Sequence, residues 1–295
     1  MKLKTKDLLT LAELTPKEFS RLIDYSIKLK KDLKNKTLTM IFQKPSTRTR
    51  VSFETGMYQL GGHAINLSSN DMQLSRGESV EDTAKTLSRY SDCIMARVYD
   101  HNLLEVLSKH ASIPIINGLS DSFHPCQILA DFMTIKEKKK KFKGLKIAWI
   151  GDGNNVCNSM IYGAALSGAS MSIATPKGFT PEKKVVKESE NLTEITLTTD
   201  PTTAAKNADV VVTDTYSSIH NDDPKRIQEF LPKFQVNPKL MKFAKKNAIF
   251  LHCLPAKREQ EVTSSVIDGP QSVVWDEAEN RLHTQKALLA SLIHA

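Results

Sequence analysis

Residues 38–54 read LTMIFQKPSTRTRVSFE, and this stretch indicates a strand that leads directly into a helix. The apolar run LTMIF at 38–42 has the length and composition of a buried strand. The hydroxyl residues of the next segment, KPSTRTR at 44–50, are suited to begin a helix. A strand followed at once by a helix is the repeating unit of α/β proteins with parallel sheets, so the same alternation is expected elsewhere in the chain.

The first half of the chain repeats this alternation. A helix is predicted before the first strand, because Thr15, Pro16 and Glu18 form the start of a capping box. Strands are expected at 38–42, 64–67, 93–98 and 113–116, and helices are expected to begin near Ser46, Val80, His101 and His124.

The second half shows the same pattern. Strands are expected at 146–150, 171–174, 195–198, 209–213 and 249–251, with helices at 155–166, 181–190, 238–246 and 276–293. The predicted fold class is therefore α/β, with two doubly wound parallel-sheet domains. In such sheets ligands bind beyond the carboxyl ends of the strands, so functional residues are expected at the strand-to-helix junctions.

The length and the charge of the chain limit the classes of function to be considered. The 295 residues suffice for two domains of about 150 residues each. The formal net charge is +8, but residues 136–146, KEKKKKFKGLK, carry +6 of it and leave only +2 for the rest of the chain. This local excess argues against a nucleic-acid-binding protein. The lysine run is interpreted as a solvated linker, with an anion-binding patch as the alternative.

Membrane, metal and dinucleotide proteins are not indicated. No apolar stretch is long enough for a transmembrane helix, and Asp7 and Glu13 interrupt the segment where a signal-peptide core would form. The four cysteines lie far apart and form no CxxC pair, so we expect a reducing cytoplasm and no metal site. GDGNNV at 151–156 resembles a dinucleotide fingerprint only in part, because its last position is Val156, so no cofactor is expected.

The segment KPSTRTR is the first candidate site. If a helix begins there, its free N–H groups and positive dipole end favour an anion. The hydroxyls of Ser46, Thr47 and Thr49 add donors, and the planar fork of Arg48 suits phosphate oxygens. The alternative is a plain capped helix with arginines on its surface.

Five segments of the chain, in this order, resemble motifs of the carbamoyltransferase family: KPSTRTR with SFE, DMQLSRGE at 71–78, HPCQ at 124–127, HCLP at 252–255 and ENR at 279–281. The resemblance covers essentially the whole chain. HPCQ, GDGNN and HCLP resemble the ornithine branch of the family in particular. The resemblance implies a carbamoyl-phosphate-binding domain at 1–135, an ornithine-binding domain at 146–275, and a C-terminal helix at 276–295 that packs back on the first domain.

The same resemblance implies a reaction and its residues. The carbamoyl group of carbamoyl phosphate would pass to the δ-amine of L-ornithine, giving L-citrulline and phosphate in arginine biosynthesis or the urea cycle. The implied catalytic residues are Arg48, His124, Cys253 and Arg281. The implied contacts to carbamoyl phosphate are Ser46, Thr47, Arg48, Thr49, Gln73, Arg97, His124, Pro125, Cys126, Gln127, Cys253, Leu254 and Arg281.

Gln73 carries a further implication, because in this family its loop reaches the active site of a neighbouring subunit. The resemblance therefore implies a homo-oligomer built from trimers, with shared active sites and with neither nucleic acid nor membrane as a partner. The alternative for Gln73 is an exposed polar loop.

The implied ornithine contacts are Asn155, Asp214, Ser218, Ile219 and Cys253. Each polar position has a plainer alternative: Asn155 as a helix cap, and Asp214 and Ser218 as turn residues. The δ-amine must lose a proton before it attacks, which costs roughly 4–5 kcal/mol at neutral pH. We expect a thiolate or carboxylate, from Cys253 and Asp214, to orient this amine without forming a covalent bond.

The loop after Asp214 departs from the family pattern. Ser218-Ile219-His220 stands where the ornithine branch has Ser-Met-Gly, and Glu259 stands where a glycine often follows the arginine. Because this loop helps to select the amine, a different acceptor such as putrescine remains the alternative to ornithine.

Overall fold

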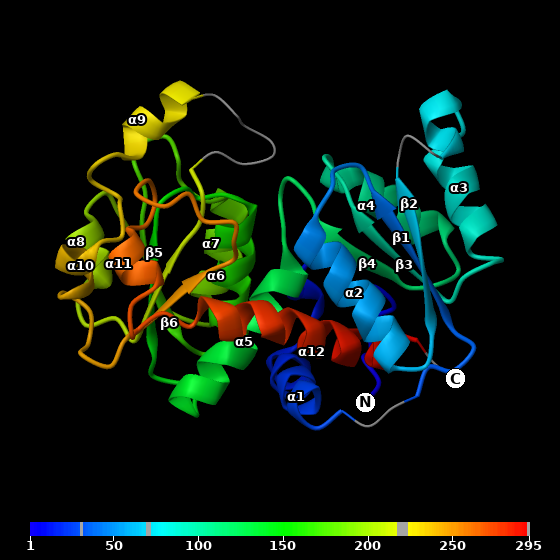
Figure 1. The fold of residues 1–295 in the computed structure, drawn as a ribbon, viewed down its shortest axis with the longest axis horizontal. Helices are drawn as coiled ribbons and strands as arrows, with labels where there is room; N and C mark the ends of the chain where they lie inside the picture. The colour runs from blue at the N-terminus through cyan, green and yellow to red at the C-terminus, as the bar shows by residue number, and fades with distance from the viewer. Residues whose placement is uncertain (30–31, 69–71, 217–223, 294–295) are drawn as a thin grey trace. The chain divides into compact units, whose positions relative to one another are not determined.

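The computed structural model describes residues 1–29, 32–68, 72–216 and 224–293. The chain divides into two compact units: unit 1 comprises Met1–Ala130 and Asn280–Ala295, and unit 2 comprises Asp131–Glu279. Each unit contains one parallel sheet with helices packed on it, which confirms the predicted fold class (Figure 1). Within the described residues no helix has both the length and the apolarity needed to cross a bilayer.

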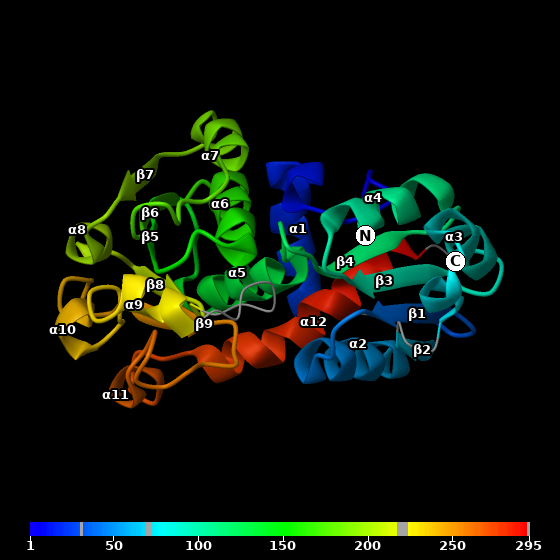
Figure 2. The same cartoon turned by 90° about the horizontal axis from the view of Figure 1, so that it is seen from above.

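Unit 1 contains a sheet of four parallel strands in the order β2-β1-β3-β4. Its strands are β1 Thr37–Phe42, β2 His63–Ser68, β3 Cys93–Arg97 and β4 Ile115–Leu119. Its connecting helices are α2 Thr47–Gln59, α3 Val80–Leu87 and α4 His101–His110. Figure 2 shows α2 on one face of the sheet and α3 with α4 on the other, as right-handed crossovers require when the strand order reverses.

Burial within this sheet follows the position of each strand. The central strand β3 is buried along its whole length, as expected for a parallel strand covered on both faces. The edge strand β4 is also buried, and its outer side is covered by Leu8, whose N–H donates to the Ile115 carbonyl at 2.9 Å. The edge strand β2 is half exposed. The expected strand at 113–116 is shifted, because Pro114 has no N–H for the ladder, whereas Asn117 and Leu119 pair with β3.

Unit 1 also contains a capped helix, two short 3-10 turns and parts of two longer helices that it shares with unit 2. α1 Pro16–Ile27 begins with the predicted capping box, since Thr15 Oγ1 accepts from Glu18 N at 3.2 Å and Glu18 Oε2 accepts from Thr15 N at 3.1 Å. Short 3-10 turns are formed by η1 Leu11–Glu13 and η3 Gln73–Arg76. α5 Pro125–Lys139 begins in unit 1 and ends in unit 2, and α12 Val274–Leu292 does the reverse.

Unit 2 contains five parallel strands in the order β7-β6-β5-β8-β9. The strands are β5 Lys146–Ile150, β6 Ser170–Ala174, β7 Ile195–Thr198, β8 Val210–Thr213 and β9 Ile249–His252. The helices are α6 Asn155–Ser167, α7 Lys183–Glu190, α8 Pro201–Ala205, η4 Pro224–Arg226, α9 Ile227–Phe230, α10 Pro238–Met241 and α11 Ser264–Ile267. α6 and α7 lie on one face of this sheet and α8 and α10 on the other (Figure 2).

Two expectations for helices in unit 2 are wrong in extent. The helix expected at 238–246 ends at Met241, because the Lys245 N–H donates to the Ala208 carbonyl at 3.0 Å. The Lys245 ammonium also pairs with Asp209 at 2.8 Å. The helix expected from Pro181 begins at Lys183, because the Glu182 N–H is taken by Asn158 Oδ1 at 3.0 Å.

The lysine run is only partly irregular. Lys136 to Lys139 belong to the last turn of α5, so the linker interpretation is wrong for these residues. The Lys138 ammonium pairs with Asp276 at 2.9 Å within unit 2. The helix continues as far as Lys139 because lysine is a good helix former and its charge is favourable near a helix C-terminus.

Candidate active site

The carboxyl ends of three strands in unit 1 bring the first group of predicted residues to one edge of its sheet. β1 leads to Ser46, the N-cap of α2, whose hydroxyl accepts from Thr49 N at 3.4 Å. β3 ends at Arg97, which pairs in register with the last residue of β1, and the segment after β4 leads to His124. The free N–H groups at the start of α2 therefore lie at the same edge as a buried arginine and a buried histidine.

Arg281 joins three helices within unit 1. Its Nη1 donates to Gln127 Oε1 at 2.7 Å, its Nη2 to Thr49 Oγ1 at 3.3 Å and its Nε to Gln285 Oε1 at 2.9 Å. All four residues are buried. The structure thus brings together Thr49, Gln127 and Arg281, three predicted contacts of carbamoyl phosphate. Gln285 was not predicted, although its place one helical turn after Arg281 is a signal that sequence reasoning could have used.

The electrostatics of this group favour an anion beside a neutral imidazole. Burial lowers the pKa of His124 well below its ordinary value. The nearby cations that lower this pKa further are Arg281, Arg97 and Arg48. His124 is therefore uncharged at neutral pH and can donate one hydrogen bond, while the guanidinium groups supply the positive field. An oxygen that gains negative charge would be stabilised here.

The remaining predicted residues of unit 1 lie in different surroundings. Pro125 is the first residue of α5 and is buried. Cys126 is fully buried, its thiol donates to the Asn117 carbonyl at 3.3 Å, and burial raises its pKa to about 12. A ligand contact of Cys126 would therefore have to use its backbone. Gln73 and Thr47 are exposed, Gln73 in η3 and Thr47 in the first turn of α2.

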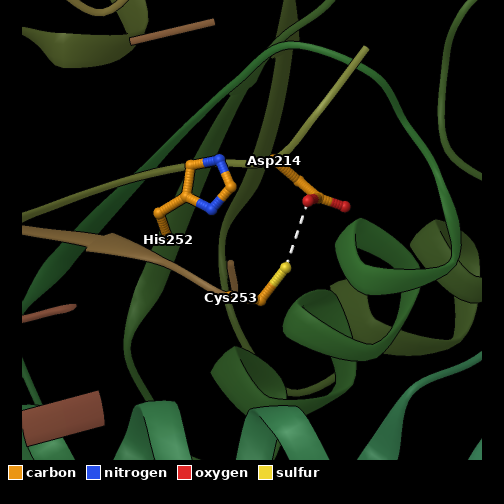
Figure 3. A group of neighbouring side chains, drawn as sticks. All are labelled: Asp214, His252 and Cys253. Atoms are coloured by element: carbon orange, nitrogen blue, oxygen red, sulfur yellow. Dashed lines mark hydrogen bonds between the residues drawn. The ribbon is translucent and has the colours of Figure 1, made fainter. Parts of the chain in front are cut away.

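In unit 2 the second group of predicted residues forms around Asp214, directly after β8. The Cys253 thiol donates to Asp214 Oδ1 at 3.1 Å (Figure 3). Asn154 Nδ2 donates to Asp214 Oδ2 at 2.8 Å, so both carboxylate oxygens are held. Asp214 is buried, and its side chain is oriented by residues from the ends of two neighbouring strands, β5 and β9. A buried, oriented carboxylate is suited to bind an ammonium group.

His252, the last residue of β9, supports the turn that carries Cys253. Its Nδ1 accepts from the Leu254 N–H at 2.9 Å, which leaves the proton on Nε2, 3.1 Å from Glu261 Oε1. The His252 backbone N–H donates to Glu277 Oε2 at 2.9 Å. Leu254 has a positive φ of 57°, and the bond between it and Pro255 is cis. The imidazole therefore holds the backbone of the HCLP turn in place.

Cys253 is a thiol rather than a thiolate in this setting. Burial raises its pKa well above the ordinary value, and the neighbouring carboxylate of Asp214 raises it further. Of the two groups expected to face the amine, Asp214 therefore supplies the negative charge, and the Cys253 thiol donates a hydrogen bond to it.

The raised pKa of Cys253 predicts slow alkylation. We expect the rate constant for iodoacetamide to increase steadily with pH between about 7 and 9.5, since the thiolate fraction is small throughout this range. Modification of Cys253 is followed by peptide mass spectrometry. A rate that levels off below about pH 8 would contradict the assigned protonation state.

The ligand atoms of Asp214, His252 and Cys253 lie within 4.8 Å of one another, the spacing of a possible metal site. Both ring nitrogens of His252 are already engaged, with Leu254 and Glu261. The thiol proton is held by Asp214. A metal ion would have to displace the hydrogen bond of one His252 ring nitrogen and the thiol proton of Cys253, so we assign no metal to this cluster.

The predicted ornithine contacts differ in how far the structure describes them. Asn155 is buried as the first residue of α6, and the cap of that helix is Asn154, whose side chain accepts from Val156 N and Cys157 N at 3.0 Å. The alternative of Asn155 as the cap is therefore wrong. Ser218 and Ile219 lie outside the described residues, as does His220. Asn154 was missed as a partner of Asp214 because sixty positions separate them.

The glycines of GDGNN have a packing role. A Cβ on Gly153 would lie 2.2 Å from Pro181 N and 2.5 Å from the Phe179 carbonyl oxygen. Only glycine permits this approach of the segment after β6. The partial dinucleotide fingerprint therefore has an explanation that involves no nucleotide.

Two family models together match most of the chain. Residues 6–137 match the aspartate/ornithine carbamoyltransferase carbamoyl-P binding domain, and residues 143–292 match the Asp/Orn binding domain of the same family. The chain belongs to the aspartate/ornithine carbamoyltransferase family. The first family match contains Arg48, Arg97 and His124, and the second contains Asp214 and Cys253.

Relatives within the aspartate/ornithine carbamoyltransferase family are similar over their full length. An ornithine carbamoyltransferase of Cenarchaeum symbiosum is 60% identical and one of Pyrococcus horikoshii is 52% identical, each match covering 99% of this chain and 99% and 96% of the relative. The solved ornithine carbamoyltransferase of Pyrococcus furiosus superposes with a TM-score of 0.94 at 50% identity, covering 99% of this chain and 98% of that one. The Thermus thermophilus enzyme gives 0.92 at 42% identity, covering 99% and 100%.

Proposed function

We propose that this chain transfers the carbamoyl group of carbamoyl phosphate to the δ-amine of L-ornithine, giving L-citrulline and phosphate. The observation that carries the proposal is the group of Arg48, Arg97 and Arg281 around the neutral His124 in unit 1. The relatives described above are all named ornithine carbamoyltransferase, and none of those names supports putrescine as the acceptor.

In this proposal unit 1 binds carbamoyl phosphate. The N–H groups at the start of α2 and the hydroxyls of Ser46, Thr47 and Thr49 hold the phosphate, with Arg97 as a further cation. Arg48 and His124 donate to the carbamoyl oxygen, which becomes an oxyanion when its carbon becomes tetrahedral. Arg281 and Gln127 complete the contacts to the carbamoyl group.

Unit 2 binds ornithine in the same proposal. Asp214 and Asn155 hold the amino-acid end, and Ser218 and Ile219 remain proposed contacts. Asp214 and Cys253 orient the δ-amine, and the backbone carbonyl of Leu254 accepts from the carbamoyl NH2 group. Since the Cys253 thiol is hydrogen-bonded to the Asp214 carboxylate and has a raised pKa, it acts as a neutral hydrogen-bond donor and not as a nucleophile.

The reaction forms one bond and breaks one. The δ-ammonium group first loses one proton to water, and the nitrogen lone pair of the resulting amine then forms a C–N bond to the carbamoyl carbon. The carbon–oxygen bond to phosphate breaks with its electron pair on the phosphate oxygen. The proton lost from the attacking nitrogen goes to the departing phosphate, so no side chain has to become charged in the product complex.

Domain roles and assembly are part of the proposal. Residues 1–135 would bind carbamoyl phosphate, residues 146–275 ornithine, and the helix of 276–295 would belong with the first domain. A homotrimer in which Gln73 serves a neighbouring active site is supported by a hollow on unit 1 that contains two exposed apolar side chains. Tyr58 of α2 is 81% exposed and Val51 is 54% exposed, and both line a hollow of about 750 Å³ next to the edge strand β2. We assign this surface to contact with a second copy of the chain.

The proposal also places the protein in the cytoplasm, with a role in arginine biosynthesis or the urea cycle.

The test is an assay of the purified protein with both substrates. We expect citrulline and phosphate in equal amounts when carbamoyl phosphate and ornithine are present together, and neither product above the spontaneous background when one is omitted. Putrescine, lysine, acetylated ornithine and aspartate serve as alternative acceptors. A higher kcat/KM for any of these than for ornithine would reject the proposed acceptor.

A further inference from the structure

An ion pair in unit 2 lies beside the cluster of Asp214, His252 and Cys253, and it has no part in the function proposed so far. Asp152 follows β5 and Arg226 ends η4, and Arg226 Nη2 donates to Asp152 Oδ2. Both side chains are largely buried, at 9% and 16% exposure. A buried ion pair costs desolvation energy and is weak evidence for stability alone, so its contacts indicate what else it does.

The guanidinium of Arg226 contacts Tyr216 and two aromatic rings in addition to Asp152. Its Nε donates to the Tyr216 carbonyl at 2.9 Å. Its carbon lies 4.7 Å from the ring centre of Phe179 and 5.7 Å from that of Phe230. Tyr216 stacks on Phe230 with ring centres 4.4 Å apart, and its hydroxyl donates to the Phe234 carbonyl at 2.7 Å. A planar guanidinium in such a setting has one orientation, and lysine cannot reproduce it.

The two anchors of Arg226 flank the contact that orients Asp214. Asp152 lies two residues before Asn154, and Tyr216 lies two residues after Asp214. Asn154 and Asp214 are themselves joined by the 2.8 Å hydrogen bond. One side chain therefore ties together the segments after β5 and β8 at the point where these neighbouring strands deliver the Asn154–Asp214 pair.

Resting on the proposed function, the geometry points to Arg226 and Asp152 as positioning residues that set the place of Asp214 and thereby the affinity for the amine acceptor. Neither residue needs to touch the substrate. Loss of the pair frees the segments after β5 and β8 to move apart, which misplaces Asp214 while the residues of unit 1 keep their contacts. A displacement of this kind weakens acceptor binding in particular.

The test is a double-mutant cycle with Arg226→Gln and Asp152→Asn. We expect each variant to raise the KM for the acceptor at least about tenfold, because the remaining partner is left buried and unsatisfied. The KM for carbamoyl phosphate should change by less than about twofold. The double variant should be no worse than the poorer single variant, because both remove the same constraint. Arg226→Lys should restore part of the affinity, since it keeps the charge but not the bond to Tyr216.

The acidity of Asp152 adds a readout that a purely structural pair would not move. Burial raises the pKa of Asp152 to about 6 against the opposing attraction of Arg226, and Asp214 raises it further. As pH falls through about 6, Asp152 gains a proton and the charge pair is lost. The acceptor KM of the unmodified protein should therefore rise below this pH, and D152N should show no such rise.

Arg258 and Asp268 provide a matched control, because they form an ion pair on the exposed surface of the same unit. Arg258→Gln and Asp268→Asn should leave both KM values unchanged. All variants are compared by circular dichroism and thermal unfolding, and if R226Q does not fold, D152N and R226K decide. Equal changes in both KM values, full additivity or an unchanged acceptor KM would overturn the positioning role. KM is measured for whichever acceptor the unmodified protein uses best, so a wrong choice of ornithine does not mask the result.

Discussion

Replacing Arg48 with alanine should lower kcat at least about 100-fold. Arg48 is one of three arginines whose positive charge lowers the pKa of the buried His124, and it is the second residue after the N-cap of α2. In the proposed mechanism its guanidinium donates to the carbamoyl oxygen as that oxygen gains charge. An interaction that strengthens in the transition state affects kcat more than substrate binding. Steady-state citrulline formation at saturating concentrations of both substrates measures the loss.

A control for Arg48→Ala is Arg21→Ala, which removes an exposed arginine from α1 of the same unit. Its kcat should stay within about twofold of the unmodified protein, because exposed single charges contribute little. If R48A folds normally and keeps more than about a tenth of the activity, Arg48 does not face the developing oxyanion.

Replacing Asp214 with asparagine should lower kcat/KM for ornithine about 100-fold and leave the KM for carbamoyl phosphate within about threefold. The side chain keeps its shape but loses the negative charge that an ammonium group requires. Asp214 also raises the pKa of Cys253, so its removal should lower that pKa. At a fixed pH near 8.5 more thiolate is then present, and iodoacetamide should modify Cys253 faster in D214N than in the unmodified protein.

These two measurements on D214N check different parts of the assignment. Slower catalysis with faster alkylation is the result expected of an anion that binds the amine and holds the thiol proton. Unchanged ornithine kinetics would remove Asp214 from the acceptor site. Asp268→Asn, on the exposed surface of unit 2, should change neither quantity.

The sequence predicted those elements that local chemistry controls. The capping box at Thr15 and Glu18 appears as expected, because it depends on residues three positions apart. The extent of α10 was not predictable, since it ends where Lys245 bonds to Ala208 and Asp209 on a different part of the chain. The strand β4 likewise continues through Asn117, which local propensity would place in a turn, because β3 supplies its hydrogen-bond partners.

The candidate site shows the same division. The resemblance to the family motifs indicated Arg48, His124, Asp214 and Cys253, and both Asp214 and Cys253 directly follow the end of a strand. Their protonation states depend on burial and on neighbours that the sequence does not reveal. His124 is neutral because it is buried among arginines, and Cys253 is a thiol because partial burial and a neighbouring carboxylate raise its pKa.

The order of strands and helices, the parallel sheets and the motifs of the carbamoyltransferase family follow from the sequence alone, because periodicity and residue type are local properties. The contacts that orient the functional residues follow only from the tertiary structure. Asn154 meets Asp214, and Asp152 meets Arg226, because β5 and β8 are neighbours in the sheet although about sixty residues separate them in the chain. Sequence spacing carries no information about such a pairing, since the strand order that creates it is decided by how the whole sheet packs.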